Sequence, residues 1–495
     1  LLLAVVVVVN TAVLWAVYRF TSFGLASRAM ADDPTTTALL GRPIGRLAAA
    51  NWVVASVLAG VAGILVAPIT ALNPGTYTLL VVPALAAALV GRLSSFGVTT
   101  AAALVLGMAQ SELVQLQDRF RWLPSAGLRE GLPLVVIVVA MAAAGRVVPE
   151  RSDKVERRLP AAPRPSRPGL PAVAAVVITA VALFGLGSEL RLGLITSLIG
   201  AVVCLSLVLL TGWVGQISLA QMAFAGVAGF ALSKLGQGAG LPFPLAPILA
   251  ATLAGVAGLI LALPALRVRG VNLAVVTLAG GVAIEELIFR NPRLTGGFGG
   301  TKVASPSVAG FDLGISRGGE YPSPVFGVLV LAVVTSLAVG LVVVRRGNLG
   351  RRLLALRANE RAAAAVGVDV VATKLGAFAA SAFVAGCAGA LLGYSQGQLS
   401  FGSFSVFVSL SFLAVAYVGG IATVPGALIG GALAGGGIVF SVLDRLAGWG
   451  RYQALFAGLG LIVVSVLRPD GVAGSSLRPR LRRHGATDTL TSETP

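Results

Sequence analysis

Uninterrupted apolar runs of membrane length constrain this chain more than any other feature of its sequence. Gly327–Val344 and Leu192–Leu210 are two examples, and about 20 predominantly apolar residues suffice to cross the hydrocarbon core of a bilayer. Of the 495 residues, 56% are hydrophobic and only 11% are charged, whereas soluble domains carry about 25% charged residues. These features exclude a soluble multidomain enzyme and predict an all-α, polytopic transmembrane helical bundle.

The apolar segments predict about fifteen membrane spans. Several of them are short or rich in glycine, so we expect some to be tilted or re-entrant. The expected spans are 1–18, 47–67, 76–90, 97–117, 131–145, 171–187, 192–211, 217–233, 242–265, 271–289, 324–344, 375–394, 404–418, 424–442 and 452–467.

The net charge of +18 fits a concentration of Lys and Arg in cytoplasmic loops. If the chain starts outside, 26 of its 37 Lys and Arg residues fall in the alternate loops that lie inside. This asymmetry predicts a multi-pass protein of a bacterial plasma membrane with a cytoplasmic C-terminus. No basic stretch is interleaved with aromatic residues, so we expect no nucleic-acid partner.

Cysteine and histidine usage excludes several kinds of site. Cys204 and Cys387 lie within apolar segments and indicate small core residues rather than a disulfide framework. The single histidine, His484, lies in a polar tail, so neither a histidine-based metal site nor a Ser-His-Asp triad is possible. We expect no metal, no cofactor and no catalytic residue in this chain.

Two polar segments predict the domain boundaries. An Arg- and Pro-rich cytoplasmic linker at 147–170 separates a first part, 1–146, from a second part, 171–470. The tail, 471–495, has the composition of a disordered segment. Because the sequence begins with Leu inside an apolar run, we expect a further segment before it.

An internal repeat relates the two parts. Residues 24–65 align without gaps on 350–391 at an offset of 326, with matches that include Gly24 with Gly350 and Gly41 with Gly367. Each copy runs in the same order from a basic loop through a Gly/Ala-rich helix to a last helix that ends in Arg. This order predicts two parallel homologous halves related by an axis along the membrane normal.

The basic segment Arg351–Gly367 and its counterpart Gly24–Gly41 are rich in helix formers but too polar to span. Each predicts one short helix at the cytoplasmic surface, which either lies on anionic lipid or docks a cytoplasmic partner. The acidic residues Asp32 and Asp33 in the first copy favour docking.

Four stretches in order resemble the signature segments of branched-chain amino-acid ABC importer permeases. They are Leu210–Phe224, Leu263–Leu278, Leu294–Gly297 and Asn359–Gly367. Residues 1–146 look like the C-terminal half of the companion permease subunit. The chain therefore resembles two permease subunits fused into one polypeptide that is truncated at its N-terminus.

The resemblance implies that Glu360, Ala363 and Gly367 belong to the loop that couples the permease to an ATPase subunit, with Gly41 as a counterpart in the first copy. No GxxxxGK[ST] motif occurs in the sequence, so ATP is expected to be used by a separate cytoplasmic ABC ATPase. An extracytoplasmic binding protein would deliver the solute, a branched-chain or similar small amino acid, with urea or amides left open.

Gln216, Ser218 and Gln221 lie between two apolar spans and are candidates for lining the translocation path, which we expect between the two halves. Packing of small residues with interhelical amide hydrogen bonds is the alternative interpretation. Glu285 and Glu286 are better explained by pairing with Arg290 or Arg293 at the interface than by a functional site. A secondary transporter driven by an ion gradient is the alternative function, and these two carboxylates would be its candidates.

Overall fold

The structure, a computed structural model, is helical almost throughout. The residues that it describes are 2–68, 77, 80–120, 127–143, 162, 169–266, 271–296, 299–308, 310–317, 319–448, 452–468 and 470–476.

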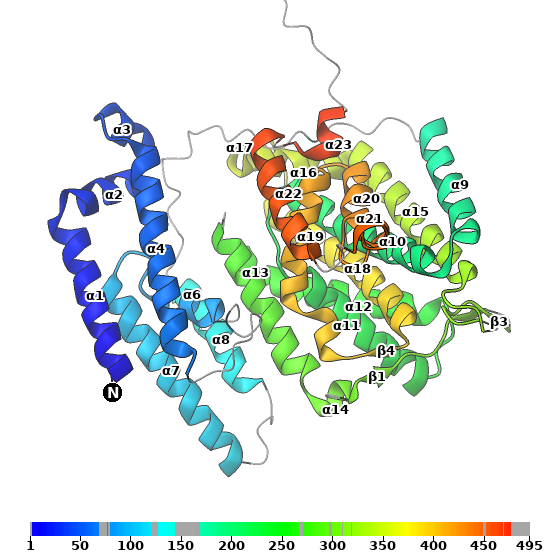
Figure 1. The fold of residues 1–495 in the computed structure, drawn as a ribbon, viewed down its shortest axis with the longest axis horizontal. Coiled ribbons are helices and arrows are strands. Elements are labelled where there is room, and N and C mark those ends of the chain that lie inside the picture. Colours follow the sequence, from blue (N-terminus) through cyan, green and yellow to red (C-terminus); the bar gives the residue numbers. More distant parts are fainter. Residues whose placement is uncertain are drawn as a thin grey trace, which may run out of the picture.

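The first part of the chain forms a series of helices, drawn in blue and cyan in Figure 1. They are α1 (Leu2–Phe20), α2 (Ser22–Asp32), α3 (Pro34–Leu39), α4 (Ile44–Val66), α6 (Val81–Val90), α7 (Phe96–Arg119) and α8 (Leu128–Ala143).

The second part is larger and includes π-helical and 3-10 segments, labelled η, and short strands. Its helices are α9 (Leu170–Gly185), α10 (Ser188–Leu207), η1 (Val208–Val214), α11 (Gln221–Ser233), η2 (Lys234–Gly238), α12 (Leu245–Ala265), α13 (Val271–Ile284), η3 (Glu285–Phe289), α14 (Pro292–Thr295), α15 (Pro324–Arg346), α16 (Asn348–Ala358), α17 (Glu360–Ala365), α18 (Val370–Gln396), η5 (Phe401–Phe404), α19 (Val406–Gly419), α20 (Val424–Ala432), α21 (Ile438–Ala447), α22 (Gln453–Leu467) and α23 (Gly471–Ser476). The antiparallel strand pairs are β1 (Thr301–Lys302) with β4 (Gln398–Leu399), and β2 (Ser307–Val308) with β3 (Phe311–Asp312).

The helices confirm an all-α, polytopic membrane protein. Within the described residues, seven helices are long and apolar enough to cross a membrane, or up to eight if the pair α1–α2, bent by 78°, is one span. The expected spans at 76–90, 171–187 and 452–467 contain shorter helices of 10, 16 and 15 residues. The total of about fifteen spans therefore stays a prediction.

α10 and η1 form a continuous 27-residue span through the centre of the second part. Every residue from 197 to 214 is buried. Glycines on α20 allow this central span to be covered closely: a Cβ at Gly431 would lie 2.4 Å from the backbone nitrogen of Ala201, and one at Gly430 would lie 3.1 Å from the Cys204 sulfur. The glycine ridge of α20 is therefore a packing surface for α10.

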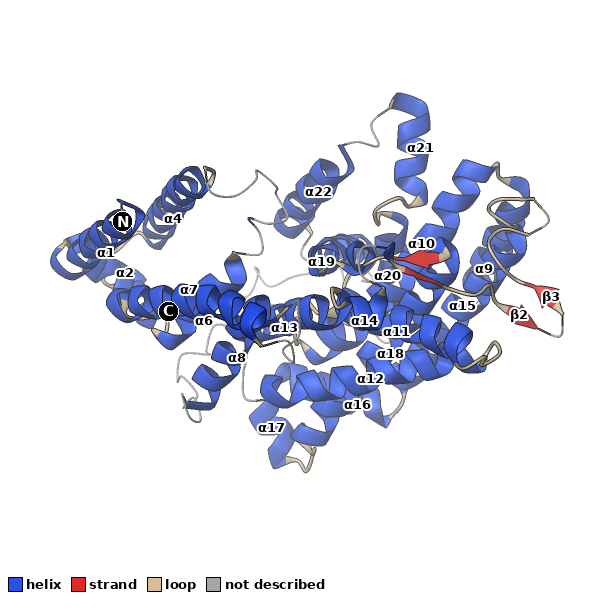
Figure 2. Ribbon diagram, turned by 90° about the horizontal axis from the view of Figure 1, so that it is seen from below, coloured by secondary structure: helices blue, strands red, loops and turns tan. Residues whose placement is uncertain are grey.

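The two parts of the chain lie side by side and meet through α8 and α13 (Figures 1 and 2). Gly127, just before α8, has φ +86, and a Cβ there would lie 2.3 Å from the carbonyl oxygen of Glu286. Only glycine allows the two backbones to approach this closely.

The repeated basic segments fold as two matching helix–turn–helix units at the same end of the molecule (Figure 1). α2 and α16 each have 11 residues, and α3 and α17 each have six. In each pair the second helix begins and ends 326 positions after the first. We call residues 22–41 the first elbow and residues 348–367 the second elbow. The local repeat is present in the structure, while two parallel halves as a whole remain a prediction.

Each elbow was expected to be a single helix, and that expectation was wrong. Asp33 and Asn359 end the longer helix with extended backbone, and their side chains accept hydrogen bonds from the first amides of the shorter helix. Capping by a short polar side chain competes with helix continuation and divides the segment.

The predicted disordered tail, 471–495, begins with an ordered helix. Residues 471–476 form α23, where Ala473 is buried and Gly471, at φ +75, packs against Gly420 of the α19–α20 turn. Disorder was therefore the wrong prediction for these six residues, because α23 packs against α19 and α20. The rest of the tail lies outside the described residues. So does the predicted linker, 147–170, apart from Ala162 and residues 169–170.

Candidate functional site

The two elbows present an exposed tip of nearly identical geometry. Gly41 and Gly367 close the two tips with φ angles of +75° and +84°. Their amides donate to Ala38 and Ala364, at 2.9 and 3.0 Å. A positive φ at this position is a glycine conformation, so the chain leaves both elbows along the same path.

An ion pair ties the second elbow to the membrane helix that follows it. Lys374 Nζ of α18 lies 2.6 Å from Glu360 Oε1 of α17, and the Lys374 side chain is only 4% exposed. The corresponding positions in the first elbow are Pro34 and Ala48, which have no charge. The second elbow is therefore held to its helix by an interaction that the first elbow cannot make.

The four predicted coupling residues fall into two groups. Glu360 and Ala363 face inward, Glu360 onto Lys374 and Ala363 at 1% exposure. Gly367 and Gly41 are exposed turn residues. The inward pair shapes the elbow, and the exposed pair lies where a partner could make contact.

The prediction missed the most exposed large apolar side chains of each elbow. Leu39 and Leu40 in the first elbow are 83% and 75% exposed, and Val366 in the second is 79% exposed. Leu40 and Val366 immediately precede the glycine of their turns. An apolar residue before a turn glycine, repeated in two otherwise polar loops, was the signal available in the sequence.

A cavity of about 730 Å³ lies within the second part. Its walls come mainly from α10, α11, the C-terminal end of α18 and α19, and from the segments around β1 and β4, at the end of the molecule opposite the elbows (Figure 1). Along α10 the lining runs from Leu192 to Val203, which spans roughly 16 Å of helix. The cavity therefore reaches about halfway through a bilayer core.

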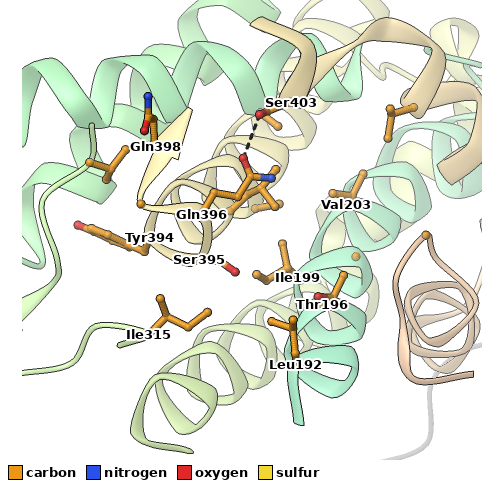
Figure 3. A pocket seen from close by; sticks show the side chains of 18 of the residues that line it. Leu192, Thr196, Ile199, Val203, Ile315, Tyr394, Ser395, Gln396, Gln398 and Ser403 are labelled. Atoms are coloured by element: carbon orange, nitrogen blue, oxygen red, sulfur yellow. Dashed lines mark hydrogen bonds between the residues drawn. The ribbon is translucent and has the colours of Figure 1, made fainter. Parts of the chain in front are cut away.

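Polar and apolar side chains both line the cavity, and the exposed Gln396 and Gln398 mark its opening (Figure 3). The labelled side chains that have polar atoms are Thr196, Tyr394, Ser395, Gln396, Gln398 and Ser403. Ser403 Oγ donates to Gln396 Oε1 at 2.9 Å, which orients that amide at the opening.

Apolar side chains line the remainder of the cavity, among them Ile199, Val203 and Met222. Among the described residues that line it there is no Asp, Glu, Lys or Arg. Because a net charge in a charge-free, partly dehydrated cavity would lose hydration without gaining a counter-charge, this lining fits a solute with no net charge and an aliphatic portion.

A break between α20 and α21 contributes to this cavity. α20 and α21 are separated at residues 433–437, where Gly436 has φ +71 and Gly435 lines the cavity. In the first part the corresponding helix, α7, runs unbroken for 24 residues. The three consecutive glycines of the second copy open the helix where the first copy continues it.

Family comparison identifies the kind of protein that carries these features. The model for "branched-chain amino acid transport system / permease component" matches residues 1–141 and 190–465. The chain belongs to this permease family. It is 30% identical over 295 residues to LivM of Salmonella typhimurium, a high-affinity branched-chain amino acid transport system permease protein, covering 56% of the chain and 68% of that relative.

The LivM protein of Escherichia coli is 29% identical over 300 residues, covering 57% of the permease and 69% of the relative. No solved structure matches the permease.

The predicted pathway residues of this permease lie outside the cavity, among packed helices. Gln221 is fully buried; its Oε1 accepts from Ser206 at 3.1 Å and its Nε2 donates to Ser381 at 3.3 Å. Ser218 and Gln216 are buried beside the end of η1. Gln221 therefore joins α10, α11 and α18 through side-chain hydrogen bonds. A role for the three residues in the translocation path stays a prediction.

Glu285 and Glu286 are buried, and each has a polar partner. Glu286 Oε2 lies 3.2 Å from Arg290 Nε, and Glu285 Oε2 accepts from the Val406 amide at 3.0 Å. The expected pairing with Arg290 is present for Glu286. Both carboxylates lie in the π-helical segment η3 at the contact with α8, so they connect elements of the permease.

Proposed function

We propose that this permease is the transmembrane component of an ATP-driven importer for branched-chain or similar small amino acids. The observation that carries the proposal is the family match over two stretches of one chain, each of which contains one elbow. Two permease units joined in one polypeptide would together present two docking sites to cytoplasmic ABC ATPase subunits.

The elbows form the cytoplasmic coupling surface in this proposal. Leu40 and Val366 would insert into an apolar recess of the ATPase, and the glycines beside them, Gly41 and Gly367, would set the angle of the tip. Exposed apolar side chains on a charged surface are typical contact points of a protein interface. The side chains of Glu360 and Ala363 would support the tip from inside.

The cavity opens at the opposite end, where an extracytoplasmic binding protein would deliver the solute. A branched-chain amino acid is a zwitterion with no net charge and an aliphatic side chain. The amide and hydroxyl groups at the mouth, including Gln396 and Ser403, offer hydrogen bonds to its charged groups, while Ile199 and Met222 accept the side chain. This assignment places the entry site within the second unit rather than between the units.

Transport would require the second unit to alternate between two packings, because close-packed helices move between discrete arrangements rather than deforming continuously. Closure of the ATPase subunits would displace the elbows and change the cavity at the far end of the same helices. Gln216, Ser218 and Gln221 would then act at the internal packing that has to rearrange.

The test is leucine uptake into proteoliposomes that contain the permease with its ATPase and binding-protein partners. We expect uptake to require ATP and to persist when ionophores collapse the ion gradients. Thr196→Trp fills part of the cavity and should reduce uptake at least about tenfold, whereas Thr252→Trp on the exposed face of α12 is the matched control.

Uptake that needs no ATP and stops when an ion gradient is collapsed would contradict the proposed function and show that the permease is a secondary transporter. Equal uptake by Thr196→Trp and wild type would remove the cavity from the pathway while leaving the ATP-driven function intact.

A further inference from the structure

We propose that Arg357 transmits movement of the second elbow to the solute cavity through its contact with Gly212, at the buried end of the α10–η1 span. We call this Arg357–Gly212 contact the joint. This inference rests on the proposed ATP-driven function and names a positioning residue within it. Arg357 lies in the last turn of α16, two residues before the Asn359 cap that divides the elbow.

The guanidinium of Arg357 binds the end of the central span directly. Its Nη1 donates to the carbonyl oxygen of Gly212 at 2.7 Å, across 145 residues of sequence. Gly212 lies in η1, near the C-terminal end of the span, where backbone carbonyls lack helical partners. A cation at this position is favoured both by the hydrogen bond and by the helix dipole.

Gly215 provides the space for this contact. It ends η1 with φ +79, and a Cβ there would lie 3.1 Å from Arg357 Cγ. The aliphatic stem of Arg357 therefore packs on the backbone of the turn while its head group binds Gly212. Burial lowers the pKa of the guanidinium from its ordinary value, with neighbouring Tyr417 and Arg345 as smaller influences.

The span that Arg357 holds is also a wall of the cavity. Leu192, Thr196, Ile199 and Val203 of α10 line the cavity, and the helix continues without a break to Gly212. From Val203 to Gly212 the span covers about 14 Å. We call the continuous helix Ser188–Val214 the rod. A displacement of the elbow that moves Gly212 thus moves the same helix that forms the cavity wall.

The rod is packed tightly enough to transmit such a displacement. All its residues from 203 to 214 are buried, and Trp213 Nε1 donates to the Ala422 carbonyl at 3.1 Å, which links the rod to the α19–α20 turn. Close-packed interiors have low compressibility. The rod and this turn would therefore shift together rather than absorb the motion locally.

The first elbow has no equivalent joint. The position that corresponds to Arg357, shifted by 326 residues, is Ala31, whose methyl side chain can donate no hydrogen bond. The second elbow also has the Glu360–Lys374 pair. Both are charged contacts that the second elbow makes with neighbouring helices. The first elbow is connected to α4 by a neutral hydrogen bond instead, from Asn51 Nδ2 to Ser27 Oγ at 3.0 Å.

The experiment compares Arg357→Gln and Arg357→Lys with Arg352→Gln, a control at an exposed arginine on the same helix. Each full-length variant is reconstituted with the ATPase and binding protein, and ATP hydrolysis, ATPase affinity and leucine uptake are measured in parallel. We expect Arg357→Gln to keep ATPase affinity and hydrolysis within about twofold while uptake per ATP falls about tenfold or more. Arg357→Lys should recover part of the uptake, and Arg352→Gln should behave as wild type.

A second measurement follows the cavity wall itself. Thr196→Cys, in a background with Cys204→Ala and Cys387→Ala, is labelled by a maleimide with and without ATP. We expect the labelling rate to change with ATP when Arg357 is present and to stay constant in Arg357→Gln.

Unchanged uptake per ATP, or an ATP response of the labelling that survives Arg357→Gln, would overturn the joint. A parallel loss of ATPase affinity would assign Arg357 to docking instead. Absence of ATP-dependent uptake in the wild type would contradict the proposed function, which is a separate result from failure of the joint.

Discussion

The two elbows have the same backbone conformation and differ in the contacts that their side chains make with neighbouring helices. Both have an 11-residue helix, a polar cap, a six-residue helix and a left-handed glycine. Only the second has Arg357 on the Gly212 carbonyl and Glu360 on Lys374. The comparison teaches that the elbow backbone is duplicated, while the charged contacts behind it belong to the second elbow. The first elbow is connected to α4 by the neutral hydrogen bond from Asn51 Nδ2 to Ser27 Oγ.

The largest expected effect tests whether the two tips are equivalent docking surfaces. Leu40→Asp and Val366→Asp each place a carboxylate on an exposed apolar tip, and we expect each to weaken ATPase binding about 30-fold or more, since desolvating the charge at an interface is costly. Binding is measured by titrating the ATPase onto the reconstituted permease. Leu40→Ala and Val366→Ala are milder controls. A loss confined to one elbow would show that only one docks.

The next effect tests whether both elbows need a glycine where the first helix of each elbow packs closely on the backbone of the preceding helix. A Cβ at Gly24 would lie 2.3 Å from Tyr18 Cα, and one at Gly350 would lie 2.5 Å from the Arg345 carbonyl oxygen. Gly24→Ala and Gly350→Ala should each destabilise the protein by about 1–3 kcal/mol, measured as a lower thermal unfolding temperature in detergent. Gly376→Ala, where no atom lies within 4 Å, is the control and should leave that temperature unchanged or raised.

A smaller effect is expected in the second elbow alone, because only that elbow has the Glu360–Lys374 ion pair. Lys374→Met leaves the Glu360 carboxylate without its counter-charge, and we expect about 1–2 kcal/mol of local destabilisation, reduced from the fully buried case because Glu360 is 21% exposed. Hydrogen exchange should accelerate at the second elbow and not at the first.

The double variant with Glu360→Gln is the control for Lys374→Met, since it removes both charges and should recover part of the protection. Equal exchange changes in both elbows would mean that the pair has no local role.

The smallest effect concerns pH. Hydrogen bonds from the Thr36 side chain, and from the Thr36 and Thr35 amides, hold the pKa of Asp33 below its ordinary value. A carboxyl whose pKa is lower in the folded state stabilises the fold above its unfolded pKa, and this contribution is lost as the pH falls through the folded pKa. Exchange protection of the Thr35 and Thr36 amides should therefore decrease below about pH 4.

Asn359 makes the equivalent hydrogen bonds without titrating, so the second elbow should keep its protection over the same pH range. Asp33→Asn should remove the pH dependence of the first elbow. A second elbow that responds to acid as strongly as the first would contradict this assignment of the cap.

Much of the local structure was predictable because its causes are local. Apolar runs of membrane length determine the class of protein, because a helix about 20 residues long crosses the bilayer with all its backbone hydrogen bonds made within one segment. The repeat of Gly24 with Gly350 and Gly41 with Gly367 predicted matching surface segments. The division of each segment into two helices was missed, although Asp33 before a proline and Asn359 are both helix-capping signals.

The sequence by itself determined the membrane class, the permease family and the two surface segments, because hydropathy, motif order and turn glycines act over short stretches of chain. Only the tertiary structure decided that Glu360 points to Lys374, that Gln221 lies in a helix-packing network, and that Arg357 meets Gly212. It also placed the cavity within the second part of the chain. These features depend on side chains distant in sequence meeting in packed helices, and spacing along the chain contains no information about such contacts.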